Sequence, residues 1–183
     1  GVDLDRQDAK TANYALIYGV GPHRLLTQIP GLLTIPATNH AIKAFFTARP
    51  RLRPWHSEVI TDTRKFGYSE SFFGRRRYLP SIWSGIVKDR MSAEREAVNQ
   101  VIQGTGADIM KMALRRVWEA ITPFNGKLIL TSHDDVVVEC PLTHRNSVAR
   151  IVGGMTEGLV PVTLPVEVKT GHTWGDMKLW REL

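Results

Sequence analysis

The hydrophobic pattern is clearest between residues 128 and 139, where two apolar segments flank a polar tip. The segments Leu128–Leu130 and Val136–Val138 are apolar, and His133-Asp134-Asp135 lies between them. Apolar and β-branched runs on both sides of turn-forming residues predict a β-hairpin over about residues 127–140.

Helical periodicity dominates the first 65 residues. The pattern predicts a helix over 6–18 that Asp5 or Asp3 caps and Gly19–Pro22 ends, a short helix over 23–28, a helix from Thr38 or Asn39 to about 49, and, after Pro50 and Pro54, a helix to about 65. Residues 34–36 are expected to be loop.

The second part of the chain mixes the two periodicities. It predicts a strand over 66–73, a helix over 92–121 interrupted by Gly104–Gly106, the central hairpin, a helix over 144–159, a strand over 162–169, and a tail from 171 that either docks or is mobile. The expected fold class is α+β, with long helices over antiparallel strands.

The composition suits a globular protein with a polyanionic partner. The 183 residues are 43% hydrophobic and 23% charged, with a net charge of +6. A single cysteine, Cys140, excludes an internal disulfide and favours a reducing compartment, so a cytoplasmic location is expected, in the nucleoid or in a virus-infected cell. No apolar run is long enough to cross a membrane, and the first residues, acidic and without an initiator Met, predict a piece of something longer rather than a signal peptide.

A cationic and aromatic stripe runs along the first predicted helix. Arg6, Lys10, Tyr14 and Tyr18 recur every four residues, which places them on one slowly drifting face. Such a face can hold a polyphosphate at its basic end and stack a base at its aromatic end. The alternative is a solvated charged face.

Two further segments carry groups suited to nucleic acid. Arg75, Arg76 and Arg77 predict a rigid guanidinium cluster for phosphate, or else a basic surface turn. Arg95, Asn99 and Gln103 recur every four residues and can contact sugars and base edges, or else form a polar solvent face; the glycines after Gln103 would permit close approach of another backbone.

The hairpin tip carries two adjacent carboxylates, Asp134 and Asp135. Carboxylate oxygens are hard ligands that suit Mg²⁺, so the tip predicts a divalent-metal site. An exposed acidic turn is the alternative, because Asp is common in turns.

Four segments in order resemble DNA polymerase family A, typified by bacterial DNA polymerase I. The segments are Arg6-x3-Lys10-x3-Tyr14-x3-Tyr18-Gly19 (motif B, the fingers helix), Phe73 to Pro80, Glu94-Arg95-x3-Asn99-x3-Gln103-Gly104-Thr105 with Ala107-Asp108 (the palm helix), and His133-Asp134-Asp135 (motif C). The resemblance covers about residues 6–174. It implies an incomplete polymerase domain, with fingers over 1–65 and palm over 66–183.

The resemblance also implies a role for each matching residue. Arg6, Lys10 and Tyr14 would bind the incoming nucleotide, with Lys10 also catalytic. Asp134 and Asp135 would be catalytic and hold Mg²⁺ in a two-metal site, although the family usually has the longer Glu where Asp135 stands. The implied DNA contacts are Tyr18, Gly19, Arg75, Arg76, Arg77, Arg95, Asn99, Gln103 and His133.

The implied activity is template-directed DNA synthesis in replication or repair, adding deoxynucleotides to a primer. The family's other metal-binding Asp, in motif A, lies N-terminal to the fingers helix, and this sequence has no such segment. The expected partners are therefore primer–template DNA, deoxynucleoside triphosphates and an N-terminal remainder that carries motif A and the thumb. A non-catalytic DNA-binding remnant and a relative of the single-subunit RNA polymerases are the alternatives.

Overall fold

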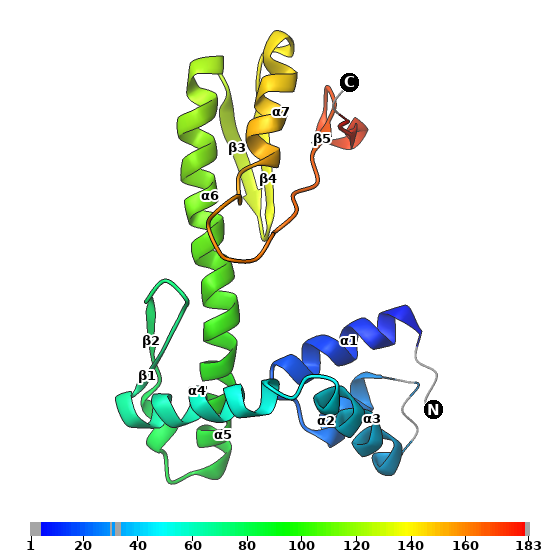
Figure 1. Cartoon of the computed structure of the whole chain (residues 1–183), viewed down its shortest axis with the longest axis vertical. Helices are drawn as coiled ribbons and strands as arrows, with labels where there is room; N and C mark the ends of the chain where they lie inside the picture. The colour runs from blue at the N-terminus through cyan, green and yellow to red at the C-terminus, as the bar shows by residue number, and fades with distance from the viewer. Residues whose placement is uncertain (1–4, 30, 32–33, 182–183) are drawn as a thin grey trace. The chain divides into compact units, whose positions relative to one another are not determined.

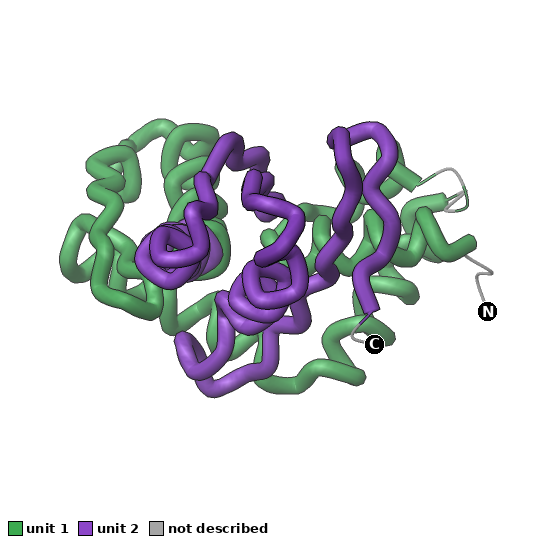
Figure 2. Tube along the Cα trace, turned by 90° about the horizontal axis from the view of Figure 1, so that it is seen from above, with its two compact units in different colours: residues 1–105 green, residues 106–183 purple. Residues whose placement is uncertain are grey.

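The computed structural model describes residues 5–29, 31 and 34–181, and it divides into two compact units. Unit 1 covers residues 1–105 and unit 2 covers residues 106–183 (Figure 2). Helices and antiparallel strand pairs together confirm the α+β class. The units group residues 66–105 with the N-terminal helices, while the expected fingers and palm boundary at 65/66 stays a prediction. No helix in the described part of the chain is both long and apolar enough to cross a membrane.

Unit 1 is mostly helical (Figure 1). It contains α1 (Arg6–Ile17), α2 (Pro22–Gln28), α3 (Ile35–Thr47), α4 (Leu52–Phe66), β1 (Tyr68–Glu70), β2 (Arg76–Tyr78), the 3-10 helix η1 (Pro80–Trp83), α5 (Val87–Asn99) and the π-helical turn η2 (Gln100–Gly104). β1 and β2 form an antiparallel hairpin in which Ser69 pairs with Arg77.

Local signals explain the first helices. The Asp5 side chain accepts a hydrogen bond from the Asp8 backbone N–H at 2.7 Å, which confirms Asp5 as the cap; Asp3 lies outside the described residues. The predicted start of the next long helix was wrong, because Thr34 caps α3 by accepting from Ala37 N, and Pro36 lies in the first turn, where a missing N–H costs nothing.

The expected strand over 66–73 is also wrong at both ends. α4 runs through Phe66 and ends at Gly67, which has φ +77°. Only Tyr68–Glu70 pairs as a strand, because the chain turns back at Ser71, whose N–H donates to Arg75 O at 3.0 Å. The helix expected from 92 begins earlier, at Val87.

The two glycines do not interrupt the long helix. The segment passes from α5 through η2 into α6 (Thr105–Ile121). A Cβ on Gly104 would lie 2.6 Å from Gln100 Nε2, while a Cβ on Gly106 would meet nothing within 4 Å. Gly104 therefore makes room for the side chain of Gln100, while the predicted approach of another backbone at Gly106 stays a prediction.

Unit 2 packs α6 and α7 (Arg145–Gly153) beside the central hairpin (Figure 1). Ala113, Val117 and Ile121 are buried and pack near Val148. The other elements are η3 (Thr122–Phe124), β3 (Lys127–Ser132), β4 (Asp135–Glu139), η4 (Leu142–His144), β5 (Lys169–Thr170), η5 (Trp174–Asp176) and β6 (Lys178–Leu179). The predicted hairpin is confirmed, with a register shift between Leu128 and Leu130.

The last elements differ from the expected ones. α7 ends at Gly153, short of the predicted 159, because two glycines follow one another there and glycine is a poor helix former. The expected strand over 162–169 is unpaired apart from Lys169, since Pro161 and Pro165 have no N–H to donate to a ladder. The tail docks: Trp180 N donates to Val168 O at 2.8 Å, and Trp180 Nε1 donates to Asn146 Oδ1 at 3.3 Å.

Candidate nucleotide and nucleic-acid site

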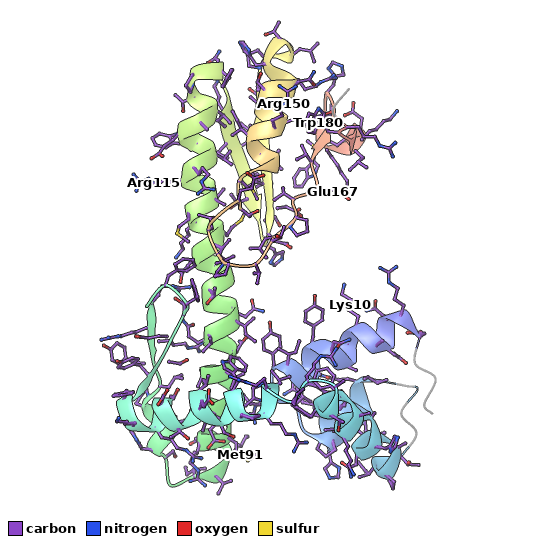
Figure 3. All side chains as sticks on the ribbon, viewed as in Figure 1. Lys10, Met91, Arg115, Arg150, Glu167 and Trp180 are labelled. Atoms are coloured by element: carbon purple, nitrogen blue, oxygen red, sulfur yellow. The ribbon has the colours of Figure 1, made fainter. Side chains whose placement is uncertain are left out.

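The α1 stripe is exposed, and other residues of the helix hold it in place. Arg6 and Lys10 are exposed, and the Tyr14 side chain is 55% exposed; Figure 3 shows Lys10 projecting from the helix. Ala15 and Leu16 are buried against α2. The basic and aromatic residues therefore share a face that the core does not use, as the spacing predicted.

Two contacts, one from α4 and one from the segment between α3 and α4, position the C-terminal end of α1. His56 Nε2 lies 2.8 Å from Ile17 O, and Arg49 donates to Asn13 Oδ1 at 3.2 Å. Gly19, at the end of the stripe, has φ +75°, a left-handed backbone that favours glycine. The helix is thus anchored at its C-terminal half, while Arg6 and Lys10 extend from the other half.

Tyr18 and Gln103, which the sequence placed in separate motifs, are joined directly. Gln103 Nε2 donates a hydrogen bond to Tyr18 Oη at 2.5 Å. Both residues belong to unit 1. The structure therefore brings the end of motif B against the palm-helix motif, and no pattern in the sequence indicated that contact.

The polar face of the long helix is altered by the π-helical turn. Arg95 and Asn99 are separated by four residues of α-helix, but Gln103 lies within η2, where a turn holds more residues. Arg95 and Gln103 are exposed and Asn99 is half-buried. The π-helical turn changes the angle between Asn99 and Gln103, and the prediction that all three side chains face the DNA stays a prediction.

The three consecutive arginines do not form one guanidinium cluster. Arg76 and Arg77 lie in β2, so their side chains point to opposite faces of the hairpin. Arg76 pairs with Glu70 at 3.2 Å and lies over the Tyr68 ring, while Arg77 pairs with Glu96 at 2.6 Å and Arg75 donates to Gly104 O at 2.9 Å. The hydrogen bond to Glu70 raises the pKa of Arg76. Sequence reasoning missed these acidic partners, which lie far from the arginines along the chain or across the hairpin.

The acidic tip of the central hairpin belongs to unit 2. Ser132 pairs with Asp135, which leaves His133 and Asp134 as the turn residues. His133 has φ +54°, a left-handed conformation that costs a residue with a Cβ about 1–2 kcal/mol. Strain of this kind often accompanies a functional turn. His133, Asp134 and Asp135 are all exposed.

The donor type at this tip fits a hard divalent cation. Mg²⁺ usually takes one or two carboxylates, with water and phosphate oxygens as its other ligands. Asp134 and Asp135 can supply those carboxylates. Across residues 5–29, 31 and 34–181, no three His, Cys, Asp or Glu side chains gather to hold a metal ion. Cys140, which follows β4, is half-buried, and burial raises the pKa of its thiol, so it suits packing better than reaction or ligation.

Comparison with known proteins places these features in a family. The family model described as DNA polymerase family A matches residues 2–176. The chain is 35% identical over 170 residues to the thermostable DNA polymerase I of Thermus aquaticus, and 36% identical over 177 residues to DNA polymerase I of Deinococcus radiodurans. These alignments cover 92% and 94% of this chain but only 20% and 18% of the relatives. The chain therefore spans about a fifth of their length.

A solved structure is similar as well. The POL domain of Pol1 from M. smegmatis, in complex with a DNA primer-template and dNTP, superposes with a TM-score of 0.81 at 29% sequence identity. The superposition covers 88% of this chain and 29% of that one.

Proposed function

The chain belongs to DNA polymerase family A, and on that premise we propose that it is the fingers and palm portion of a template-directed DNA polymerase. The observation that carries the proposal is the α1 stripe, in which Arg6, Lys10 and Tyr14 are exposed, half-buried Tyr18 follows at the C-cap, and other residues of the helix pack on α2. A protein that only bound duplex DNA would not need a triphosphate grip beside a base-stacking surface.

The incoming deoxynucleotide would lie along α1. Arg6 and Lys10 would neutralise the triphosphate, because Arg binds phosphate oxygens bidentately and Lys acts as a point charge. Tyr14 would stack on the sugar and base. Lys10 would also stabilise the negative charge that develops as the primer 3′-hydroxyl attacks the α-phosphate and pyrophosphate leaves.

The proposed DNA contacts are assigned residue by residue. Tyr18 and Gly19 would border the template base, and Arg95, Asn99, Gln103 and His133 would contact the duplex near the primer terminus. Near the duplex we also place Arg75, Arg76 and Arg77. Each could bind a phosphate only by sharing or breaking its present hydrogen bond or ion pair.

Asp134 and Asp135 would hold Mg²⁺ at the hairpin tip. Bound there, Mg²⁺ would activate the 3′-hydroxyl and neutralise the phosphates in the two-metal scheme of nucleotidyl transfer. Asp134, in the turn, and Asp135, in the strand, would supply two of the oxygen ligands. We place a further carboxylate in an N-terminal remainder with motif A, so this chain is a fragment or one part of a split polymerase.

Primer extension tests this proposal. The 183-residue chain is assayed on primed DNA with Mg²⁺ and all four deoxynucleotides, alone and with an N-terminal polymerase I segment that carries motif A. Extension is expected only with both, and Asp134→Asn should abolish it. Asp62→Asn, an exposed position on α4, is the matched control and should leave extension unchanged.

The other outcomes separate the alternatives. Binding of primed DNA without extension by the combined proteins would make the chain a non-catalytic DNA-binding remnant. Preferential use of ribonucleotides would favour a relative of the RNA polymerases. Extension by the chain alone, lost in Asp134→Asn, would show that no outside carboxylate is required.

A further inference from the structure

The β1–β2 hairpin is fastened to the helical segment from Ala97 to Thr105 (Figure 1). Four hydrogen bonds make the connection: Ser69 Oγ to Ala97 O at 2.8 Å, Phe72 N to Thr105 Oγ1 at 2.8 Å, Arg75 Nη2 to Gly104 O at 2.9 Å, and Gln100 Nε2 to Arg75 O at 3.4 Å. All of them lie within unit 1.

Arg75 contacts both ends of the π-helical turn. Its backbone carbonyl accepts from Gln100, the first residue of η2, and its guanidinium donates to the carbonyl of Gly104, the last residue. Gln100 is only 8% exposed, and its side chain occupies the space that a Cβ on Gly104 would need. π-Helical turns are rare. Arg75 adds a side-chain hydrogen bond to the carbonyl at the end of this one.

Gln103 lies inside this turn and reaches Tyr18 from it. If η2 closed to a regular α-helix, one residue of register would be lost. Each residue of an α-helix corresponds to a rotation of about 100°. The side chain of Gln103 would then leave the face that meets Tyr18.

We propose that Arg75 is a positioning residue: by bridging Gln100 and Gly104 it maintains the π-helical turn that directs Gln103 toward Tyr18 and the DNA. The role of Gln103 toward DNA rests on the proposed function, whereas the bridge itself does not. Arg75 thus serves primarily to hold the helix rather than to bind phosphate.

Hydrogen–deuterium exchange tests the bridge in the full chain. Arg75→Gln removes the charge-assisted hydrogen bond, and amides of residues 100–105 should exchange roughly tenfold faster, while those of α7 keep their rates. Arg115→Gln is the matched control, because Arg115 forms an exposed pair with Glu119 and contacts no part of η2 in the described contacts. Unchanged exchange at 100–105 in Arg75→Gln would overturn the proposal.

A double-mutant cycle then tests what the bridge does. Affinity for a fluorescent primer–template with a single-stranded template overhang is measured for Arg75→Gln, Gln103→Ala and the double variant. Arg75→Gln should weaken binding roughly three- to tenfold, with little further loss in the Gln103→Ala background. The dependence of log Kd on log salt concentration should keep its slope.

A direct phosphate contact would behave differently. It would weaken binding equally in both backgrounds and lower the salt slope by about 0.9, and that result would overturn the proposal. If the unaltered chain fails to bind primed DNA, the proposed function fails, while the exchange result still decides the bridge.

Thr105→Val covers the case in which Arg75→Gln does not fold, as judged by circular dichroism. It removes the hydroxyl that accepts from Phe72 N and donates to Val101 O, and it leaves the charge of the hairpin intact. The same local increase in exchange is expected. Unchanged exchange in this variant would also count against a hairpin that holds the π-helical turn.

Discussion

Gln103 Nε2 donates a hydrogen bond to Tyr18 Oη, and this contact spans 85 positions of the chain. It joins the C-terminal cap of α1 to the π-helical turn that follows α5. If a template base stacks near Tyr18, any movement of the tyrosine would therefore reach Gln103, the residue that we propose contacts the duplex.

Tyr18→Phe should lower stability slightly. The substitution removes the acceptor of Gln103 and leaves the ring, so we expect a loss of about 0.5 kcal/mol in the free energy of unfolding, small because the pair is exposed. Urea unfolding followed by tryptophan fluorescence measures it. Tyr14→Phe, at a 55% exposed ring, is the control and should change stability less. Equal losses would mean that the contact contributes nothing.

Gly104→Ala should destabilise the chain although alanine favours helix. The new Cβ would lie 2.6 Å from Gln100 Nε2 and 2.9 Å from its Cδ, so the buried amide must move. We expect a loss of about 1–3 kcal/mol, the usual cost of overpacking. Gly106→Ala meets nothing within 4 Å and should be neutral or stabilising by up to about 1 kcal/mol. The midpoint temperature of thermal unfolding should fall for Gly104→Ala and stay level or rise for Gly106→Ala.

His133→Gly should stabilise unit 2, although it removes the side chain that we propose contacts the duplex at the hairpin tip. Glycine accepts φ +54° without the Cβ penalty, so the free energy of unfolding should rise by up to about 1 kcal/mol, offset in part by the greater freedom of the unfolded chain. Asn125→Gly is the control at the same φ, and a smaller gain is expected because Asn tolerates this region. A loss of stability in His133→Gly would show that the His side chain makes a contact worth more than the strain.

Glu70→Gln should tighten binding to primed DNA. The change frees the Arg76 guanidinium from its carboxylate partner and removes a negative charge beside the hairpin. At low salt the affinity should rise roughly twofold to fivefold, and the advantage should shrink as salt is added. Glu119→Gln breaks the exposed pair with Arg115 and changes the net charge equally. If both variants gain the same affinity, the effect is one of net charge and Arg76 does not face DNA.

Much of the local structure was predictable because it depends on short-range rules. The 3.6-residue period gave α1, and the apolar runs on both sides of a polar tip gave the hairpin. The expectations that failed concern termini and pairing. Thr34 rather than Thr38 caps α3, and residues 162–168 belong to no strand of the described sheets, since caps and ladders depend on partners that a local pattern does not contain.

The sequence by itself determined the family, the fold class and which residue types could meet a nucleotide, a metal ion and DNA, because these follow from residue identity and spacing. Only the tertiary structure decided that Gln103 meets Tyr18, that Glu70 and Glu96 occupy Arg76 and Arg77, and that Arg75 bridges a π-helical turn. The reason is physical: a hydrogen bond or ion pair requires two groups to lie within about 3 Å. When the two groups are up to 85 residues apart in the chain, no local sequence pattern indicates that they lie so close together.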